Sequence, residues 1–181
     1  MKFDSEIISQ NFKNALIKEL QSTPLAVFES FWYKGPDRTQ YYKSKLLPQV
    51  ARELGYDFLP EFLLVDYAFL NNERVPVVFI ESEHSHESAV RETDKLCAVC
   101  SPVKVLFLCC SWYDGVRKQF LPRWQERIAT HHKYSCGKAV YFIVVGERGR
   151  GNPEDHVLRY YIESYNESGE EIFNKTITIE K

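Results

Sequence analysis

Two apolar runs that carry acidic residues constrain the fold of this chain more than any other feature. Residues 62–70 (FLLVDYAFL) and 75–83 (VPVVFIESE) are rich in the β-branched and aromatic side chains that favour strands. The polar residues NNER between them are typical of a turn, so the pattern predicts an antiparallel hairpin. Pro76 lies at the start of the second strand, where a missing N–H is tolerated. The molecule is therefore expected to be built around a sheet.

Helical patterns dominate the residues before this hairpin. A first helix is expected to have Ser5 as its N-cap, and a second to begin at Thr23-Pro24 and run to residue 31. A third is expected to end at Leu54, with Pro48 kinking or restarting it. The apolar stripe of the first helix has i/i+4 spacing: Ile8, Phe12, Leu16 and Leu20.

After the hairpin, helical and strand patterns alternate. The unit from Val77 to Cys110 should pair its two strands in parallel through a right-handed crossover. A mixed α/β sheet flanked by helices is therefore predicted, in a single domain of residues 1–181. Its parts would be helical (1–55), a sheet core (56–112), and a helix with C-terminal strands (113–181). The predicted segments are helices at 86–100 and 116–131 and strands at 103–110, 139–147, 156–165 and 170–179.

The composition is that of a globular protein without a membrane segment. Of the 181 residues, 44% are apolar and 27% charged, and no apolar run approaches the roughly 18–20 residues that span a bilayer. The N-terminal residues lack the apolar core of a signal peptide and the cysteines number five, so a reduced, cytoplasmic protein is expected. A net charge of −2 gives no global attraction to nucleic acid, which would need local basic patches.

Hairpin geometry predicts that three acids share one face of the sheet. If the loop is Asn71 to Arg74, Asp66 lies opposite Phe79, and opposite residues share a face. Side chains alternate along a strand, so Glu81 and Glu83 point to that face as well. An even loop preserves this result, whereas an odd loop or a bulge destroys it.

Three clustered carboxylates would repel each other and lose hydration, unless a cation compensates them. Oxygen-only ligands suit Mg²⁺ or Mn²⁺, so Asp66, Glu81 and Glu83 are the predicted metal ligands. A bound Mg²⁺ could polarise a phosphodiester and activate a water. The alternative is that the acids line a solvent-facing side and pair with Lys or Arg. The acids end a very apolar strand, where α/β sites usually open, and this favours the metal site.

The order of these motifs resembles the PD-(D/E)XK restriction-endonuclease-like superfamily. VDYAFL, a turn, VVFIESEH, a helix with ETDKL and the strand VKVLFLC carry the resemblance, within residues 40–112. It implies a restriction-endonuclease-like fold, with Asp66 and Glu81 as the first and second metal-binding acids. Glu83 stands where most members carry a lysine, although some restriction enzymes of this fold use glutamate there.

Lys95, on the following helix, could replace the missing lysine as a catalytic residue, and Glu92 lies three residues before it. The superfamily also often carries an acid on the helix before the first strand, for which Glu53 is the candidate. The competing interpretations are an exposed surface lysine and a solvated helix face.

Other groups of metal-binding residues are weaker candidates. His84 and His86 follow Glu83, but strand alternation places His84 on the opposite face. His131 and His132 are favourable charges at a helix end or simple surface residues. The cysteine pairs invite a zinc interpretation, yet one lies on a helix stripe and the other in a buried strand, so core packing is favoured: Cys97 and Cys100, Cys109 and Cys110.

Two segments could contact nucleic-acid phosphates. The loop 146–153 carries Arg148 and Arg150 but lacks the spacing of a phosphate loop. A basic stretch with interleaved tyrosines is either a nucleic-acid contact or a solvated helix face. It comprises Lys34, Arg38, Tyr41, Tyr42, Lys43, Lys45 and Arg52.

These features favour a Mg²⁺-dependent nuclease that hydrolyses phosphodiesters in DNA. The alternative is a catalytically inactive nuclease-like domain that acts as a binding or assembly module, which the acidic net charge and the missing lysine favour. The sequence does not fix the oligomeric state, so a homodimer and a complex with a protein partner are both left open.

Overall fold

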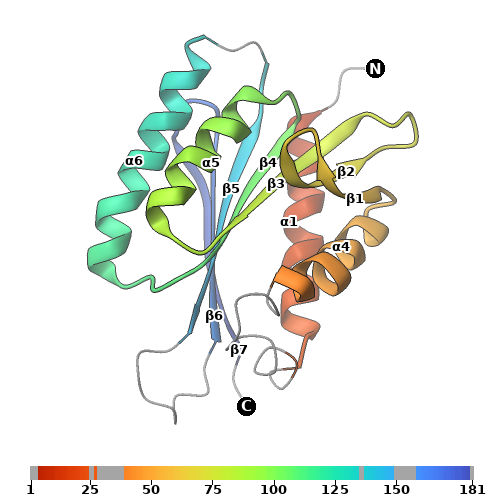
Figure 1. Cartoon of the computed structure of the whole chain (residues 1–181), viewed down its shortest axis with the longest axis horizontal. Coiled ribbons are helices and arrows are strands. Elements are labelled where there is room, and N and C mark those ends of the chain that lie inside the picture. Colours follow the sequence, from red (N-terminus) through yellow and green to blue (C-terminus); the bar gives the residue numbers. More distant parts are fainter. Residues whose placement is uncertain (1–3, 25–26, 28–38, 135–136, 149–157, 180–181) are drawn as a thin grey trace.

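The computed structural model describes residues 4–24, 27, 39–134, 137–148 and 158–179, which form a seven-stranded sheet with helices on both faces (Figure 1). The strands lie in the sheet in the order of the sequence. They are β1 (Asp57–Phe62), β2 (Val65–Leu70), β3 (Pro76–Glu83), β4 (Val103–Cys109), β5 (Val140–Arg148), β6 (Leu158–Tyr165) and β7 (Glu171–Ile179). The predicted mixed α/β class is confirmed.

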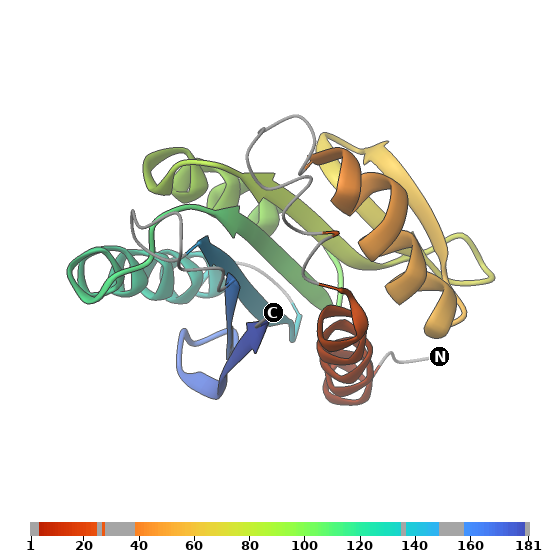
Figure 2. The ribbon, with the colours of Figure 1, turned by 90° about the horizontal axis from the view of Figure 1, so that it is seen from below.

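Two pairs of helices enclose the sheet, and Figure 2 shows them on opposite sides. Helices α1 (Ser5–Ser22) and α4 (Leu47–Glu53) cover one face, and α5 (His86–Ala98) and α6 (Asp114–His132) cover the other. Each face has its own apolar core. Tyr67 and Ile80 pack on the α1 side, whereas Ala68 and Phe79 pack on the α5 side.

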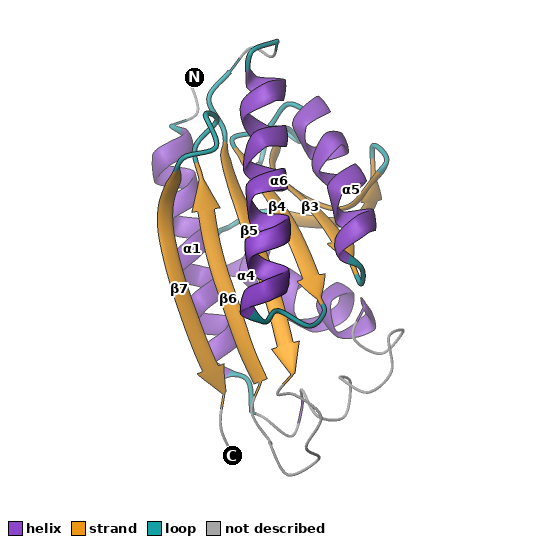
Figure 3. Ribbon diagram, turned by 90° about the vertical axis from the view of Figure 1, so that its left-hand side faces the viewer, coloured by secondary structure: helices purple, strands orange, loops and turns teal. Residues whose placement is uncertain are grey.

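The centre of the sheet is parallel and its flanks are antiparallel. β3 pairs with β4, and β4 with β5, in parallel, while the other neighbours are antiparallel. The predicted β3–α5–β4 parallel unit is confirmed, and every residue of β4 is buried. Figure 3 shows β7 at the sheet edge, beside β6 and away from α5.

Helix α1 follows the predicted stripe, with Ile8, Phe12, Leu16 and Leu20 all buried. Its cap differs from the prediction. Asp4 accepts hydrogen bonds from the backbone N–H groups of Glu6 and Ile7, and Ser5 is the first helical residue. The second predicted helix, from Thr23-Pro24 to residue 31, lies almost entirely outside the described residues.

The third predicted helix is interrupted near its proline, as expected. A π-helical turn (Tyr42–Leu46) comes immediately before α4, whose first turn contains Pro48. Proline lacks the N–H that a continuous helix would need there, and a first turn needs no such donor. The helix ends before Gly55, which has a left-handed φ of 72°.

Strand β1 was not predicted, because residues 62–70 were expected to form one strand. In the structure β1 ends at Phe62, Leu63 and Leu64 make a turn, and β2 begins at Val65. A turn made of two leucines has no Gly, Asn, Asp or Pro to reveal it, so the sequence pattern appears as continuous strand.

The β2–β3 hairpin keeps the predicted faces through a different register. Leu70 pairs with Pro76, so the loop has an odd length, and a bulge then brings Phe69 opposite Val78. The predicted pair of Asp66 with Phe79 is therefore wrong, because Ala68 faces Phe79. An odd loop and a one-residue bulge each reverse the faces, and together they restore them.

The remaining elements follow the predictions closely. Helix α6 and strands β4 to β7 lie where expected, and β6 and β7 form the closing hairpin. One correction concerns Cys100, which lies beyond the end of α5 and is exposed instead of belonging to the buried stripe. Within the described residues, no helix is both long enough and apolar enough to cross a membrane.

The β6–β7 turn packs closely on α6, and this contact yields a first prediction. Gly169 and Gly55 both have left-handed φ angles. A Cβ added at Gly169 would lie 2.5 Å from the Gln125 carbonyl oxygen, whereas a Cβ added at Gly55 would have no atom within 4 Å. Gly55→Ala should cost about 1 kcal/mol of stability from the backbone alone. Gly169→Ala should cost clearly more, since the backbone of α6 must also shift. Urea unfolding of both variants measures this difference, and equal costs would contradict the packing.

Candidate functional site

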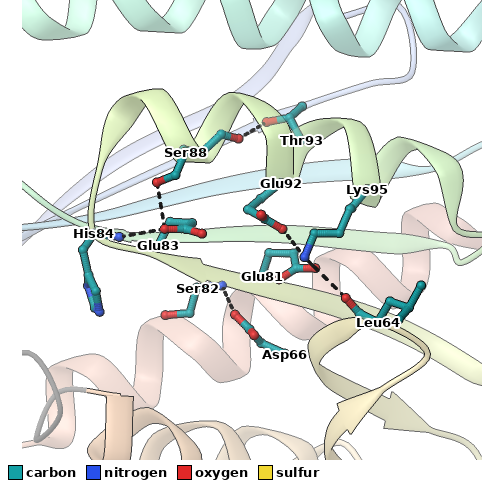
Figure 4. Close-up of polar contacts among 11 residues, drawn as sticks. Leu64, Asp66, Glu81, Ser82, Glu83, His84, Ser88, Glu92, Thr93 and Lys95 are labelled. Atoms are coloured by element: carbon teal, nitrogen blue, oxygen red, sulfur yellow. Dashed lines mark hydrogen bonds and ion pairs between the residues drawn. The ribbon is translucent and has the colours of Figure 1, made fainter.

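The predicted acids lie where β2 and β3 run under helix α5. Tyr67 and Ile80 are the last paired residues of β2 and β3 at this end of the hairpin, and Asp66 and Glu81 are the next residue on each strand. Glu81 lies two residues after Phe79, on the face that α5 covers, and Figure 4 shows it beside Lys95 of that helix, while Asp66 is directed to the backbone of Ser82. The structure therefore places Asp66 and Lys95 each near Glu81.

Glu81 is a buried carboxylate, with only 1% of its surface exposed. Burial raises the pKa of its carboxyl to about 8, the charges of Asp66 and Glu92 act in the same direction, and Lys95 opposes them. The Oε1 atom lies 3.0 Å from Lys95 Nζ as an ion pair, without the geometry of a hydrogen bond. Glu81 thus has a countercharge beside it, but burial still favours its protonated form at neutral pH.

Lys95 connects the acids with the neighbouring turn. Its ammonium forms ion pairs with Glu81 and Glu92 and donates a hydrogen bond to the carbonyl oxygen of Leu64 at 3.4 Å. Partial burial would lower the pKa of Lys95, but the two glutamates outweigh it and raise the pKa. Lys95 therefore stays charged, and it occupies the position of a cation beside Glu81.

Asp66 and Glu83 are held by different partners. Asp66 Oδ2 accepts a hydrogen bond from the backbone N–H of Ser82 at 2.8 Å, on the strand that carries Glu81. Glu83 Oε2 accepts one from the Ser88 hydroxyl at 2.8 Å, in the first turn of α5. Figure 4 shows Glu83 directed to Ser88 and separated from the group around Lys95.

The donor set of Asp66 and Glu81 suits a hard divalent cation. Both offer only oxygen, and Mg²⁺ is commonly bound by one or two carboxylates while water and phosphate complete its shell. A buried carboxylate with little hydrogen bonding would gain from such an ion. In the described part of the chain, no group of three or more His, Cys, Asp or Glu side chains is arranged to hold a metal ion.

The other candidate residues lie apart from this group. Glu53 forms a surface ion pair with Lys18 at 2.7 Å. His86 stacks on Phe120, with ring centroids 4.8 Å apart, so it has a packing role. His131 lies at the end of α6 and contacts Asp94 at 3.1 Å.

The cysteines are structural where they are buried. Cys97 lies in the core on the α5 side, and Cys109 in the core on the other side of the sheet. Cys97 and Cys100 are not joined in disulfides. Core packing is confirmed for Cys97 and Cys109, whereas Cys100 is exposed.

The basic stretch lacks the surface aromatic side chains that stacking on bases would need. Tyr41 and Tyr42 are both buried, and the Tyr42 hydroxyl lies 2.9 Å from Cys109 Sγ. Lys43 pairs with Glu61 at 3.3 Å. Lys34 and Arg38 lie outside the described residues, as does the loop 149–153 with Arg150, while Arg148 ends β5.

Two further glutamates, Glu147 and Glu163, are buried and were missed by the sequence analysis. Glu163 on β6 is 1% exposed and pairs with Arg117 of α6 at 2.6 Å, while its other oxygen accepts a hydrogen bond from Tyr165. Burial raises the pKa of its carboxyl. The signal was present in the sequence, because residues 162–164 repeat the Ile-Glu-Ser of residues 80–82.

No protein-family model matches this chain, and no curated protein matches it in sequence. What the group around Glu81 can do must therefore follow from its own residues and their geometry.

The raised pKa of Glu81 makes stability depend on pH. Because the folded-state pKa of about 8 lies above the ordinary 4.5, the stability that protonated Glu81 contributes is complete below pH 4.5. It is lost as the pH rises through about 8. Without divalent ions, the wild type should lose about 2–3 kcal/mol more than Glu81→Gln between about pH 5.5 and about pH 8.5.

Urea unfolding across this pH range measures the effect. Glu73→Gln, at an exposed position of the β2–β3 turn, is the matched control and should keep the wild-type pH dependence. Parallel pH profiles for the wild type and Glu81→Gln would show that burial does not hold the proton on Glu81.

Proposed function

We propose that this protein is a divalent-metal-dependent nuclease that hydrolyses phosphodiester bonds in DNA, with its site at Asp66 and Glu81. The observation that carries the proposal is the burial of Glu81 near Asp66, under a helix that delivers Lys95. Two carboxylates and one ammonium at the end of a strand match the charges of a phosphodiester site, where a cation and a lysine neutralise the phosphate.

We also propose membership of the PD-(D/E)XK superfamily with a restriction-endonuclease-like arrangement. The order β2, β3, α5, β4 supports it, because the antiparallel pair carries the two acids and the helix leads to a parallel strand. Lys95 supports it as well, since it reaches Glu81 from α5 and supplies a charge that position 83 does not.

Each residue has a defined role in the proposed reaction. Asp66 and Glu81 would hold Mg²⁺ or Mn²⁺, which when bound polarises the phosphodiester and activates a water. Lys95 would move from Glu81 toward the phosphate and stabilise the negative charge of the transition state. Glu83 would be a further ligand or a base that orients the water, after leaving Ser88.

A second candidate is a nuclease-like domain without catalysis, which works as a binding or assembly module. The specific observation in its favour is that the group is already paired, because Lys95 neutralises Glu81 and Ser88 holds Glu83. In that case the ion pair would only stabilise the packing of α5 on the sheet.

Cleavage of plasmid and single-stranded DNA with Mg²⁺ or Mn²⁺ separates the two candidates. Asp66→Asn and Glu81→Gln should each lower the cleavage rate about 100-fold or more, because each removes a charged metal ligand. Glu163→Gln removes the charge of another buried glutamate on the same sheet and should keep the rate. No cleavage by the wild type, together with no metal binding in calorimetry, would overturn the nuclease proposal.

A further inference from the structure

The turn between β1 and β2 consists of two leucines in a strained conformation. Leu63 and Leu64 have φ angles of 51° and 70°, between the paired residues Phe62 and Val65. Two-residue hairpin turns with positive φ at both positions normally use Asn-Gly or Asp-Gly, because other side chains collide with the backbone there. The turn therefore costs free energy that a polar sequence would not.

Both leucines are also exposed to solvent. Leu64 is 91% exposed and Leu63 64%, the two highest exposures among the described aliphatic side chains. Residues that combine backbone strain with exposed apolar surface are unfavourable on two counts. Strain of this kind concentrates at functional sites, so the turn itself is a candidate for function.

The turn is fixed beside the group around Glu81. The carbonyl oxygen of Leu64 accepts a hydrogen bond from Lys95, the lysine that pairs with Glu81 (Figure 4). At its base, the Phe62 ring stacks on Phe79 of β3, with centroids 6.3 Å apart. The two leucines thus project from a rigid support next to the proposed reaction site.

Two lysines, each paired with glutamate, lie near the turn. Lys95 approaches from α5, and Lys43 pairs with Glu61, two residues before Leu63. The Lys43–Glu61 pair is exposed, and exposed pairs are weak enough for a phosphate to compete with the carboxylate. A nucleic acid would offer the leucines the apolar faces of its bases, and its phosphates would compete with the glutamates for the two lysines.

We propose that Leu63 and Leu64 form a wedge that inserts between adjacent bases of DNA and unstacks them beside the bond to be hydrolysed. The inference rests on the proposed nuclease function and adds to it the state of the substrate, a locally opened duplex. Apolar side chains inserted between base steps unstack and kink a duplex, at a cost that the new contacts must repay.

The surroundings of the turn favour a nucleic acid over a protein partner. A protein interface needs an apolar centre built from several residues. The other large apolar side chains that are exposed in the described part of the chain lie on other elements, such as Ile7 on α1, Tyr134 after α6 and Ile172 on β7. Two leucines flanked by Glu61 and Lys95 form a narrow tip and not a patch.

The double variant Leu63→Asn/Leu64→Gly tests the wedge without damaging the fold. Because Asn-Gly suits this turn, the variant should unfold at a higher urea concentration than the wild type, so a loss of function cannot reflect unfolding. Ile172→Asn, which removes an exposed apolar side chain from β7, is the matched control.

The readout is the fluorescence of 2-aminopurine in duplex DNA, which rises when this base is unstacked. All proteins would carry Glu81→Gln, with Mg²⁺ present, so that unstacking is observed without hydrolysis. We expect increased fluorescence with both leucines present and with Ile172→Asn, and the value of free duplex with Leu63→Asn/Leu64→Gly. Affinity for the duplex should fall about tenfold in that variant, the equivalent of one lost stacking contact.

The outcomes separate the wedge from the nuclease proposal. Equal fluorescence with and without the leucines overturns the wedge, even if the wild type cleaves DNA. A leucine-dependent rise supports the wedge, even if the wild type does not cleave. Absence of a rise together with self-association that the leucines mediate would assign the tip to a protein contact, and this too would overturn the wedge.

Discussion

The burial of the Glu81 carboxylate is the constraint on which the region between β2, β3 and α5 depends. An ionised carboxylate without water is costly unless a charge of opposite sign is close. Among the described residues, Lys95 forms the ion pair with Glu81 and also holds Glu92 and the Leu64 carbonyl. One ammonium therefore joins a strand, a helix and a turn, and its release would loosen all three contacts.

Glu163 shows how the same fold buries an acid for structural purposes. Glu163 is 1% exposed, like Glu81. It forms an ion pair with Arg117 and accepts a hydrogen bond from the Tyr165 hydroxyl. Glu81, in contrast, is paired with Lys95, whose side chain is 43% exposed and is therefore able to move. A buried carboxylate whose countercharge is mobile can exchange that charge for a metal ion more easily than one that also accepts a hydrogen bond from a buried tyrosine.

The sequence predicts most of this architecture, because the spacing of apolar residues indicates which face of a strand a side chain is on, and apolar composition indicates which strands are buried. Alternation placed Glu81 on the face of Phe79, which α5 covers, and the apolar run of β4 predicted a strand buried on both sides. The odd length of the β2–β3 loop and the bulge between Phe69 and Leu70 were not predictable, because both depend on backbone geometry that these side chains do not reveal. Strand β1 was missed because the turn after it contains no typical turn residue. The contact of Glu163 with Arg117 was missed because a partner 46 positions away leaves no local pattern in the sequence.

The element that sequence reasoning missed is the one where local preference and structure conflict most. Leu63 and Leu64 favour a strand by composition, yet the fold places them at a turn with positive φ. Natural sequences are locally consistent except where function opposes consistency, so a conflict of this kind directs attention to its surroundings. Here the conflict lies one hydrogen bond from Lys95, and Lys95 lies one ion pair from Glu81. A strained turn and an under-solvated carboxylate that share one lysine are more simply explained by one function than by two independent defects.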